Sequence, residues 1–301
     1  MKISIPELID EDEELLFSNL PEDSSPEYDS QITYQPGDVV ILEAYHRKYE
    51  AIVEVTGIHP LDGVNLEPPV WLDIGSTNRW AMFDGEAGTI TSSAFPIETV
   101  IQPDTPVDNL AMFGVEATSV LCEVYMSAQD PSTDTPVFSQ EKDLVLDPIH
   151  DFDPVEYQND FIFENLPASE GMKLRVVITP VPGESARCAL AVPGRMRTMG
   201  CTQYGMSLGI LDYSRVDRDD FGRPFIVRRR FSKLVSANLE IKNEHVDRIH
   251  KSLSQYRASP IVWVFTDMFA SSIVYGFYRD FGITVDNFTF SSCNLEVEGL
   301  I

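Results

Sequence analysis

Short apolar runs recur every 10 to 15 residues between positions 85 and 192, and Pro, Asp, Ser and Gly separate them. The runs lie at 97–101, 110–115, 120–126, 142–146, 160–163, 173–179 and 186–192. Strands of this length and spacing are typical of an antiparallel β-sandwich with Greek-key or jelly-roll connections. We therefore expect a mainly β protein in which residues 85–192 form a jelly-roll-like sandwich.

The polarity within these runs alternates as it does in strands that are buried on one face. In "CEVYMSA", Cys122, Val124 and Met126 fall on one side, and the polar or aromatic residues fall on the other. The run "KLRVVITPV" alternates in the same way, and Pro180 ends it because proline cannot donate a ladder hydrogen bond.

The C-terminal part, residues 193–301, has a different pattern that predicts an α+β assembly domain of the order β–α–β–β–β. Its helix is expected within 243–260, with Asn243 as N-cap and Pro260 closing the segment. One face of this helix would carry Val246, Ile249, Leu253 and Tyr256. Strand-like runs precede it at 223–241, and three more follow it.

Two segments, 1–31 and 32–84, precede the sandwich. Residues 1–31 hold ten acidic residues and one lysine, which predicts an acidic extended arm with one helical turn near 11–17. The arm is either disordered or, as its apolar residues favour, docked on a neighbouring subunit. Residues 32–84 are expected to form a β-hairpin and a connecting segment. Alternatively, the hairpin strands complete the C-terminal sheet, and the sandwich is an insertion in one larger domain.

The net charge of the chain bears on which partners it can bind. The net charge is −26, with 22 Lys and Arg against 48 Asp and Glu, which argues against binding nucleic acid or anionic membranes. The excess lies in the first 200 residues, whereas residues 201–301 hold 12 basic and 12 acidic residues. We interpret the neutral C-terminal part as a unit that packs within an assembly.

No cofactor or metal is expected. Cys122, Cys188, Cys201 and Cys293 form no CxxC pair, and the five histidines are scattered, so buried free thiols are favoured over a zinc site or disulfides. The N-terminus lacks a signal-peptide pattern, and no apolar run reaches the ~18 residues of a membrane span. These features predict a protein that is made, and is soluble, in a cytoplasm.

One segment, "WLDIGSTNRWAMFDG" at 71–85, raises the question of a ligand site. The candidate residues are Trp71, Asp73, Asn78, Arg79, Trp80 and Asp84. A phosphate-binding loop of a sugar kinase is excluded because no second glycine-rich loop follows. Two interpretations remain: a sugar platform in which the tryptophans stack on a ring, and the favoured structural corner, in which Arg79 pairs with Asp73 or Asp84.

The only basic cluster is Arg228, Arg229 and Arg230. In a strand, alternate side chains point to opposite faces, which suits salt bridges to an acidic neighbour better than a nucleic-acid stripe. We therefore regard these arginines as candidate subunit contacts. No set of residues has the spacing of a catalytic site, so we expect that the protein is not an enzyme.

Two stretches carry a resemblance to a known family. "VWLDIGSTNRWAMFDGEAGT" with the β-rich stretch after it, and the run from "FGRPFIVRRRF" to the C-terminus, resemble tail-tip or baseplate structural proteins of tailed bacteriophages, of the distal-tail type. The resemblance covers about residues 34–301. Some of these proteins carry carbohydrate-binding-module-like sandwiches.

The resemblance implies a virion protein, assembled in the host cytoplasm, that forms homo-oligomeric rings. Its partners would be its own copies and other tail tube or tail-tip proteins, and its C-terminal unit would be tail-tube-like. The alternative function is a carbohydrate-binding module that attaches the particle to a host-surface glycan.

Overall fold

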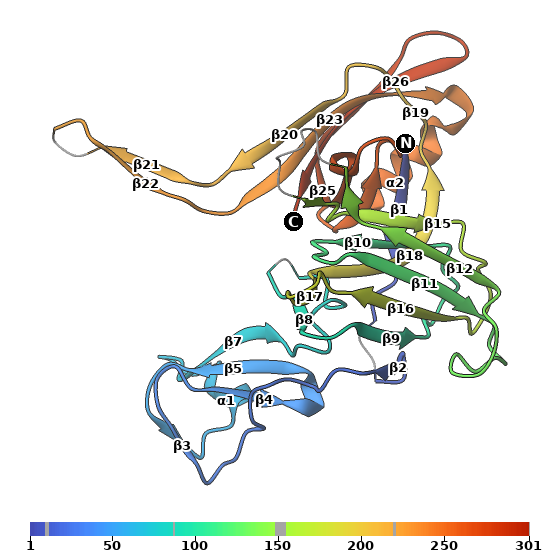
Figure 1. Cartoon of the computed structure of the whole chain (residues 1–301). Helices are drawn as coiled ribbons and strands as arrows, with labels where there is room; N and C mark the ends of the chain where they lie inside the picture. The colour runs from blue at the N-terminus through green and yellow to red at the C-terminus, as the bar shows by residue number, and fades with distance from the viewer. Residues whose placement is uncertain (10–11, 87, 148–154, 219–220, 301) are drawn as a thin grey trace.

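The computed structural model describes residues 1–9, 12–86, 88–147, 155–218 and 221–300. Strands dominate it, so the predicted mainly β fold class is confirmed (Figure 1). The described ranges contain two short α-helices, α1 (Pro60–Gly63) and α2 (Val246–Gln255), and three 3-10 turns, η1 (Glu43–Tyr45), η2 (Asn243–His245) and η3 (Ala270–Ser272). None of these helices is both long and apolar enough to cross a lipid bilayer.

A ten-stranded antiparallel sheet, the main sheet, forms the centre of the molecule. Its order is β15 (Phe161–Glu164), β10 (Asn109–Phe113), β18 (Leu190–Thr198), β1 (Lys2–Pro6), β24 (Ile261–Val264), β25 (Ile273–Val285), β26 (Phe290–Gly299), β23 (Phe231–Lys242) and β19 (Cys201–Thr202). The tenth strand, β20 (Ser207–Asp212), pairs with β23 beside β19.

The main sheet is strongly curled. The rings of Phe113 on β10 and Tyr275 on β25 lie 6.0 Å apart, although three strands separate β10 from β25. In a flat sheet, four spacings of about 4.8 Å would hold them ~19 Å apart. Lys233 on β23 also forms an ion pair with Asp160, which precedes β15 at the opposite edge. The sheet therefore wraps around an apolar cluster that includes Val192, Val262 and Ile273.

The predicted sandwich lies at one end of this sheet. A five-stranded outer sheet has the order β12 (Phe138–Asp143), β11 (Ser119–Tyr125), β16 (Lys173–Thr179), β9 (Ile97–Ile101) and β2 (Leu15–Ser18). Its inward side chains share one core with those of β15, β10 and β18. Cys122 and Val124 are buried there, as the alternation in the sequence predicts. The prediction is wrong for Met126, which follows the end of β11 and is exposed, whereas Tyr125 is buried. The packing is consistent with a β-sandwich.

The C-terminal elements follow the expected order of strand, helix and three strands, namely β23, α2, β24, β25 and β26. They do not form a sheet of their own, because β1, β18, β10 and β15 continue it. A self-contained tail-tube-like unit therefore stays a prediction.

Helix α2 uses the face that the sequence indicates. Ile249 and Leu253 are buried against the main sheet, and Val246 and Tyr256 pack at the edge of the same cluster. The predicted N-cap is wrong: Asn243 lies in the 3-10 turn before the helix, and its side chain binds Ser291 and the Asn287 carbonyl instead.

The N-terminal segment is not a separate arm. Strand β1 lies between β18 and β24, and Ile3 is fully buried. Further along, β2 joins the edge of the outer sheet beside β9. The sequence predicts a helical turn near 11–17. Residues 10 and 11 lie outside the described ranges, residues 12–14 form a turn, and residues 15–17 belong to β2. The acidic segment thus ties the two sheets of the body together.

Residues 33–76 form a small lobe with its own sheet and core. Its sheet has the order β4 (Val39–Leu42), β5 (Arg47–Ala51) and β7 (Trp71–Ser76), and β3 (Thr33–Tyr34) pairs with β6 (Val55–Thr56). The predicted hairpin is present as β4 and β5. It does not complete the C-terminal sheet, so that alternative is wrong. Figure 1 shows the lobe projecting below the sandwich.

Three further strand pairs are short: β8 (Thr91–Ser93) with β17 (Ala186–Cys188), β13 (Val145–Leu146) with β14 (Glu156–Tyr157), and β21 (Arg215–Arg218) with β22 (Pro224–Val227). The last pair lies at the end of a long hairpin, residues 207–231, which we call the arm. Figure 1 shows the arm extending well away from the body.

Candidate functional site

Trp71 is part of the small-lobe core. Its side chain is 1% exposed, and its ring makes edge contacts with Tyr28 and Tyr34 at 6.1 and 5.3 Å between centroids. Its indole N–H donates to the Ile58 carbonyl at 3.0 Å. The ring has no face available for a ligand.

Trp80 lies where the small lobe meets the body. It is 5% exposed and stacks on His46, with 4.2 Å between the ring centroids. Because both tryptophans are buried, the structure gives no support to a sugar platform at 71–84. The arrangement is that of a structural corner, the other interpretation of this segment.

The ion pairs at this corner differ from those expected. Asp73 accepts hydrogen bonds from the guanidinium of Arg47 at 2.9 to 3.2 Å. Arg79 instead donates to the Leu20 carbonyl and forms an ion pair with Glu22 at 3.4 Å. The predicted pairing of Arg79 with Asp73 or Asp84 is therefore wrong. In the pairing of β5 with β7, Arg47 lies opposite Ser76 and Tyr49 lies opposite Asp73.

Glu22 is the centre of this corner, and sequence reasoning missed it. Its carboxylate accepts a hydrogen bond from Thr77 at 2.6 Å and lies 2.9 Å from Nδ1 of His46. Together with Arg79, these contacts join the N-terminal segment, the small lobe and the turn after β7. Contacts between residues this far apart in the chain leave no local signal in the sequence.

Asn78 and Asp84 complete the segment. Asn78 exchanges hydrogen bonds with the backbone of Ser92, which fixes the turn against β8. One carboxylate oxygen of Asp84 accepts from the Glu86 amide, and the other is buried without a partner in the described structure. Burial raises the pKa of Asp84 above its usual value, although hydrogen bonds oppose the shift.

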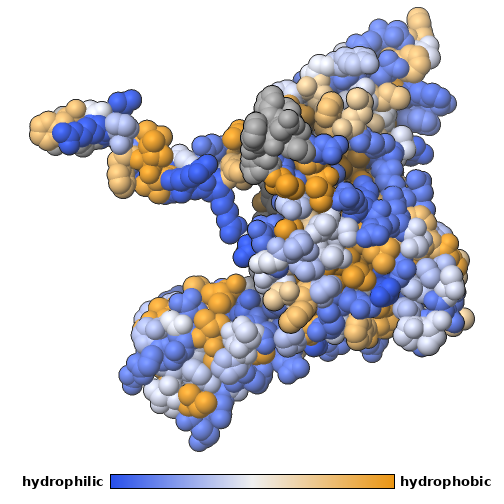
Figure 2. Space-filling view, viewed as in Figure 1, coloured by the Kyte–Doolittle hydropathy of each residue, from blue (hydrophilic) through white to orange (hydrophobic). Residues whose placement is uncertain are grey.

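The arm exposes a concentration of large apolar side chains that is unusual for a protein surface. They are Leu208, Ile210, Tyr213, Val216, Phe221, Phe225, Ile226, Val227 and Phe231. Phe225 is 66% exposed and Ile226 is 64% exposed. Figure 2 shows apolar and polar patches interleaved along it.

The arm is also basic. Its sequence holds six arginines and four aspartates, in a chain whose net charge is −26. Arg228 and Arg229 are exposed and form no ion pair with the described residues. Arg230 differs, because its guanidinium packs on the body at Gly88, where a Cβ would lie 2.8 Å from Nη1. Of the three predicted subunit contacts, the structure leaves Arg228 and Arg229 facing solvent.

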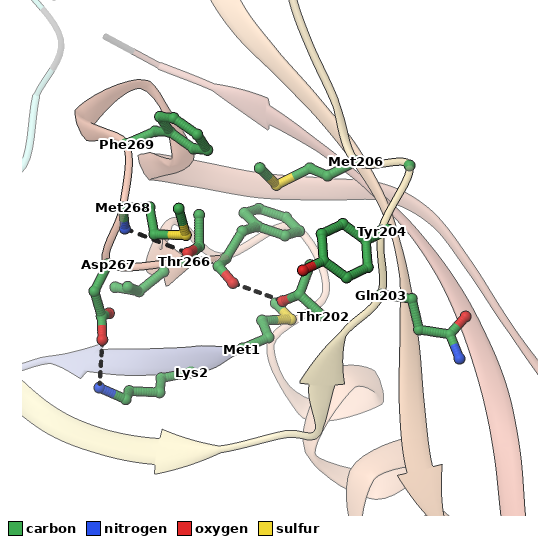
Figure 3. Close-up of a pocket in the computed structure, with 13 residues that line it drawn as sticks. Met1, Lys2, Thr202, Gln203, Tyr204, Met206, Thr266, Asp267, Met268 and Phe269 are labelled. Carbon is green, nitrogen blue, oxygen red and sulfur yellow. Dashed lines mark hydrogen bonds and ion pairs between the residues drawn. The ribbon is translucent and has the colours of Figure 1, made fainter.

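A second feature is an open groove beside the first residues of β1, with a volume of about 540 Å³ (Figure 3). The loop that follows β19 contributes Tyr204 and Met206, and the loop that follows β24 contributes Phe265, Met268 and Phe269. Asp267 lies on its border, 3.6 Å from Lys2. Figure 3 shows Tyr204, Met206 and Phe269 around the hollow. Sequence analysis did not identify these residues.

The four cysteines are free, but only three of them are buried as expected. Cys122, Cys188 and Cys293 are buried, and burial raises the pKa of the first two thiols to about 12 and of the third to about 11. Cys201 is exposed. Within the described ranges, no three His, Cys, Asp or Glu side chains are grouped as metal ligands.

Comparison with known proteins adds no identity. None of the protein-family models matches the chain, and a search of curated proteins finds no similar sequence. Function must therefore be argued from the corner, the arm and the groove.

Proposed function

We propose that this chain is a structural protein of a bacteriophage tail tip or baseplate and that its copies assemble into a homo-oligomeric ring. Its partners would be further copies of itself and neighbouring tail proteins. It acts by shape and contact and catalyses no reaction. The place of action is the virion tail, and assembly occurs in the host cytoplasm.

The observation that carries the proposal is the arm. The hairpin extends from the body and exposes nine large apolar side chains to water. This exposure is unfavourable unless a partner covers the side chains. The arm pairs basic charge with these apolar residues, and the rest of the chain is strongly acidic. A second copy of the chain therefore offers a complementary partner.

The corner at 71–84 supports the same function indirectly. The contacts of Glu22 with Arg79 and His46, the ion pair of Arg47 with Glu86 and the stacking of Trp80 on His46 hold the small lobe on the body. Rings built from many copies require rigid subunits, because each contact must recur at the same angle. The glycan-binding alternative has no comparable observation in its favour.

Labelling of phage particles with an antibody against the purified protein tests the proposal. We expect the label at the distal end of the tail, and we expect ring-shaped particles when the purified protein is imaged by negative stain. A protein that is monomeric in solution and absent from particles would contradict the proposal.

A further inference from the structure

We infer that the arm of one copy docks in the groove of the next copy, with Phe225 of β22 covered by Met268 and its neighbours. This inference rests on the proposed function and deepens it, because it names both halves of the subunit contact. The two surfaces are formed by different residues, so repetition of the contact from copy to copy is head-to-tail.

The groove has the properties of a site for apolar side chains. Met206, Phe265, Met268 and Phe269 are among the residues that line it, and methionine side chains adapt their shape to a partner. Met268 is 79% exposed, which is unfavourable for an apolar side chain unless something covers it. The volume of about 540 Å³ lies in the range of pockets that enclose small ligands, about 300–1,000 Å³.

The arm supplies matching chemistry. Strand β22 presents Phe225, which is 66% exposed, on one face, whereas Ile226 points to the opposite face. Aromatic anchors that enter a pocket commonly dominate protein interfaces. Beside the groove, the carboxylate of Asp267 is 70% exposed, and the exposed Arg228 and Arg229 of the arm carry the opposite charge.

The positions of the two surfaces exclude self-docking. In Figure 1 the β21–β22 end of the arm and the start of β1, which borders the groove, lie at opposite ends of the upper part of the molecule. An arm can therefore reach only the groove of another copy. Repetition of such a head-to-tail contact generates a closed ring if the rotation closes.

Disulfide cross-linking tests the pairing. In a Cys201→Ser background, the double variant Phe225→Cys with Met268→Cys should give a ladder of cross-linked oligomers on a non-reducing gel. The matched control, Phe225→Cys with Phe95→Cys, places the second thiol at an equally exposed site on the sandwich side and should give none. Particles that are rings by negative stain but show no 225–268 cross-link would overturn the inference and leave the proposed function standing.

A charge variant gives an independent readout. Met268→Lys introduces a cation where the arm brings arginines, so we expect the concentration needed for assembly to rise at least tenfold. Phe95→Lys is the control and should leave assembly unchanged. Docking in the groove would be contradicted if both variants raised the concentration needed for assembly equally, or if neither variant raised it. If the Cys201→Ser protein, before any cysteine is added, forms no oligomers at all, that result would count against the proposed function.

Discussion

At the residue scale, the indole of Trp71 packs on two tyrosines and donates one hydrogen bond, all within the small lobe. Trp71→Ala removes a fully buried aromatic side chain, so we expect it to lower the free energy of unfolding by about 3–5 kcal/mol. Trp71→Phe keeps most of the packing and should cost less. Denaturant titration followed by circular dichroism measures both. A variant that loses glycan binding at unchanged stability would restore the sugar-platform interpretation.

Asp84 gives a prediction about pH. Its pKa is raised in the folded protein, so the folded state binds more protons than the unfolded state just above the usual Asp value of about 3.9. Stability from this group is present below that value and is lost as pH rises through the folded pKa. Asp84→Asn should therefore remove the loss of stability that Asp84 causes as pH rises. The stability of the variant relative to wild type should improve from pH 3 towards pH 7.

Chemical denaturation at a series of pH values tests this sign. The control is Asp62→Asn, on the short helix α1 of the small lobe, because this side chain is exposed. A variant whose stability relative to wild type falls from pH 3 to pH 7, or does not change, would contradict the account of a buried, half-partnered carboxylate.

At the element scale, β1 is the clearest departure from what the sequence indicates. Composition marks residues 1–31 as an arm, because ten acidic residues dominate the count. The alternating pair Ile3 and Ile5 is too short to reveal a central strand, and its partners β18 and β24 come about 190 and 260 residues later. Local pattern cannot specify partners this distant.

This placement of β1 predicts that the segment is required for folding. Ile3→Ala deletes buried methyl groups in the core under α2 and should lower the free energy of unfolding by about 2–5 kcal/mol. Leu8→Ala is the control, since Leu8 is half exposed and should cost little. Thermal unfolding compares the two. Equal melting temperatures would indicate that residues 1–9 are only loosely attached to the body.

Other elements could be predicted because their signal is local. Alternation gave β9, β11 and β16 close to their observed bounds, and the 3.6-residue period gave the buried face of α2. At the corner, burial of the tryptophans was foreseeable from the apolar "AMF" after Trp80. The ion pairs were not, because Glu22 and Arg47 reach the corner through tertiary packing. The groove was invisible for the same reason, since three separate segments line it.

At the scale of the whole molecule, the body and the arm have different requirements. The body buries its apolar residues in two sheets and a helix, whereas the arm leaves Val216, Phe225 and Ile226 in solvent. A subunit of this shape gains stability from association, so its oligomeric state should depend on concentration. Salt should weaken association as well, because the arginines of the arm and the acidic surface of the body attract one another at long range.

Sedimentation velocity of the full chain beside an arm-shortened variant is the most direct test of assembly through the arm. The amide of Tyr213 donates to the Arg230 carbonyl, so residues 214–229 can be replaced by a two-residue Asn-Gly turn without disturbing β20 or β23. We predict that the full chain sediments as a closed oligomer and that the shortened variant sediments as a folded monomer. Oligomers of the same size from both proteins would contradict the account.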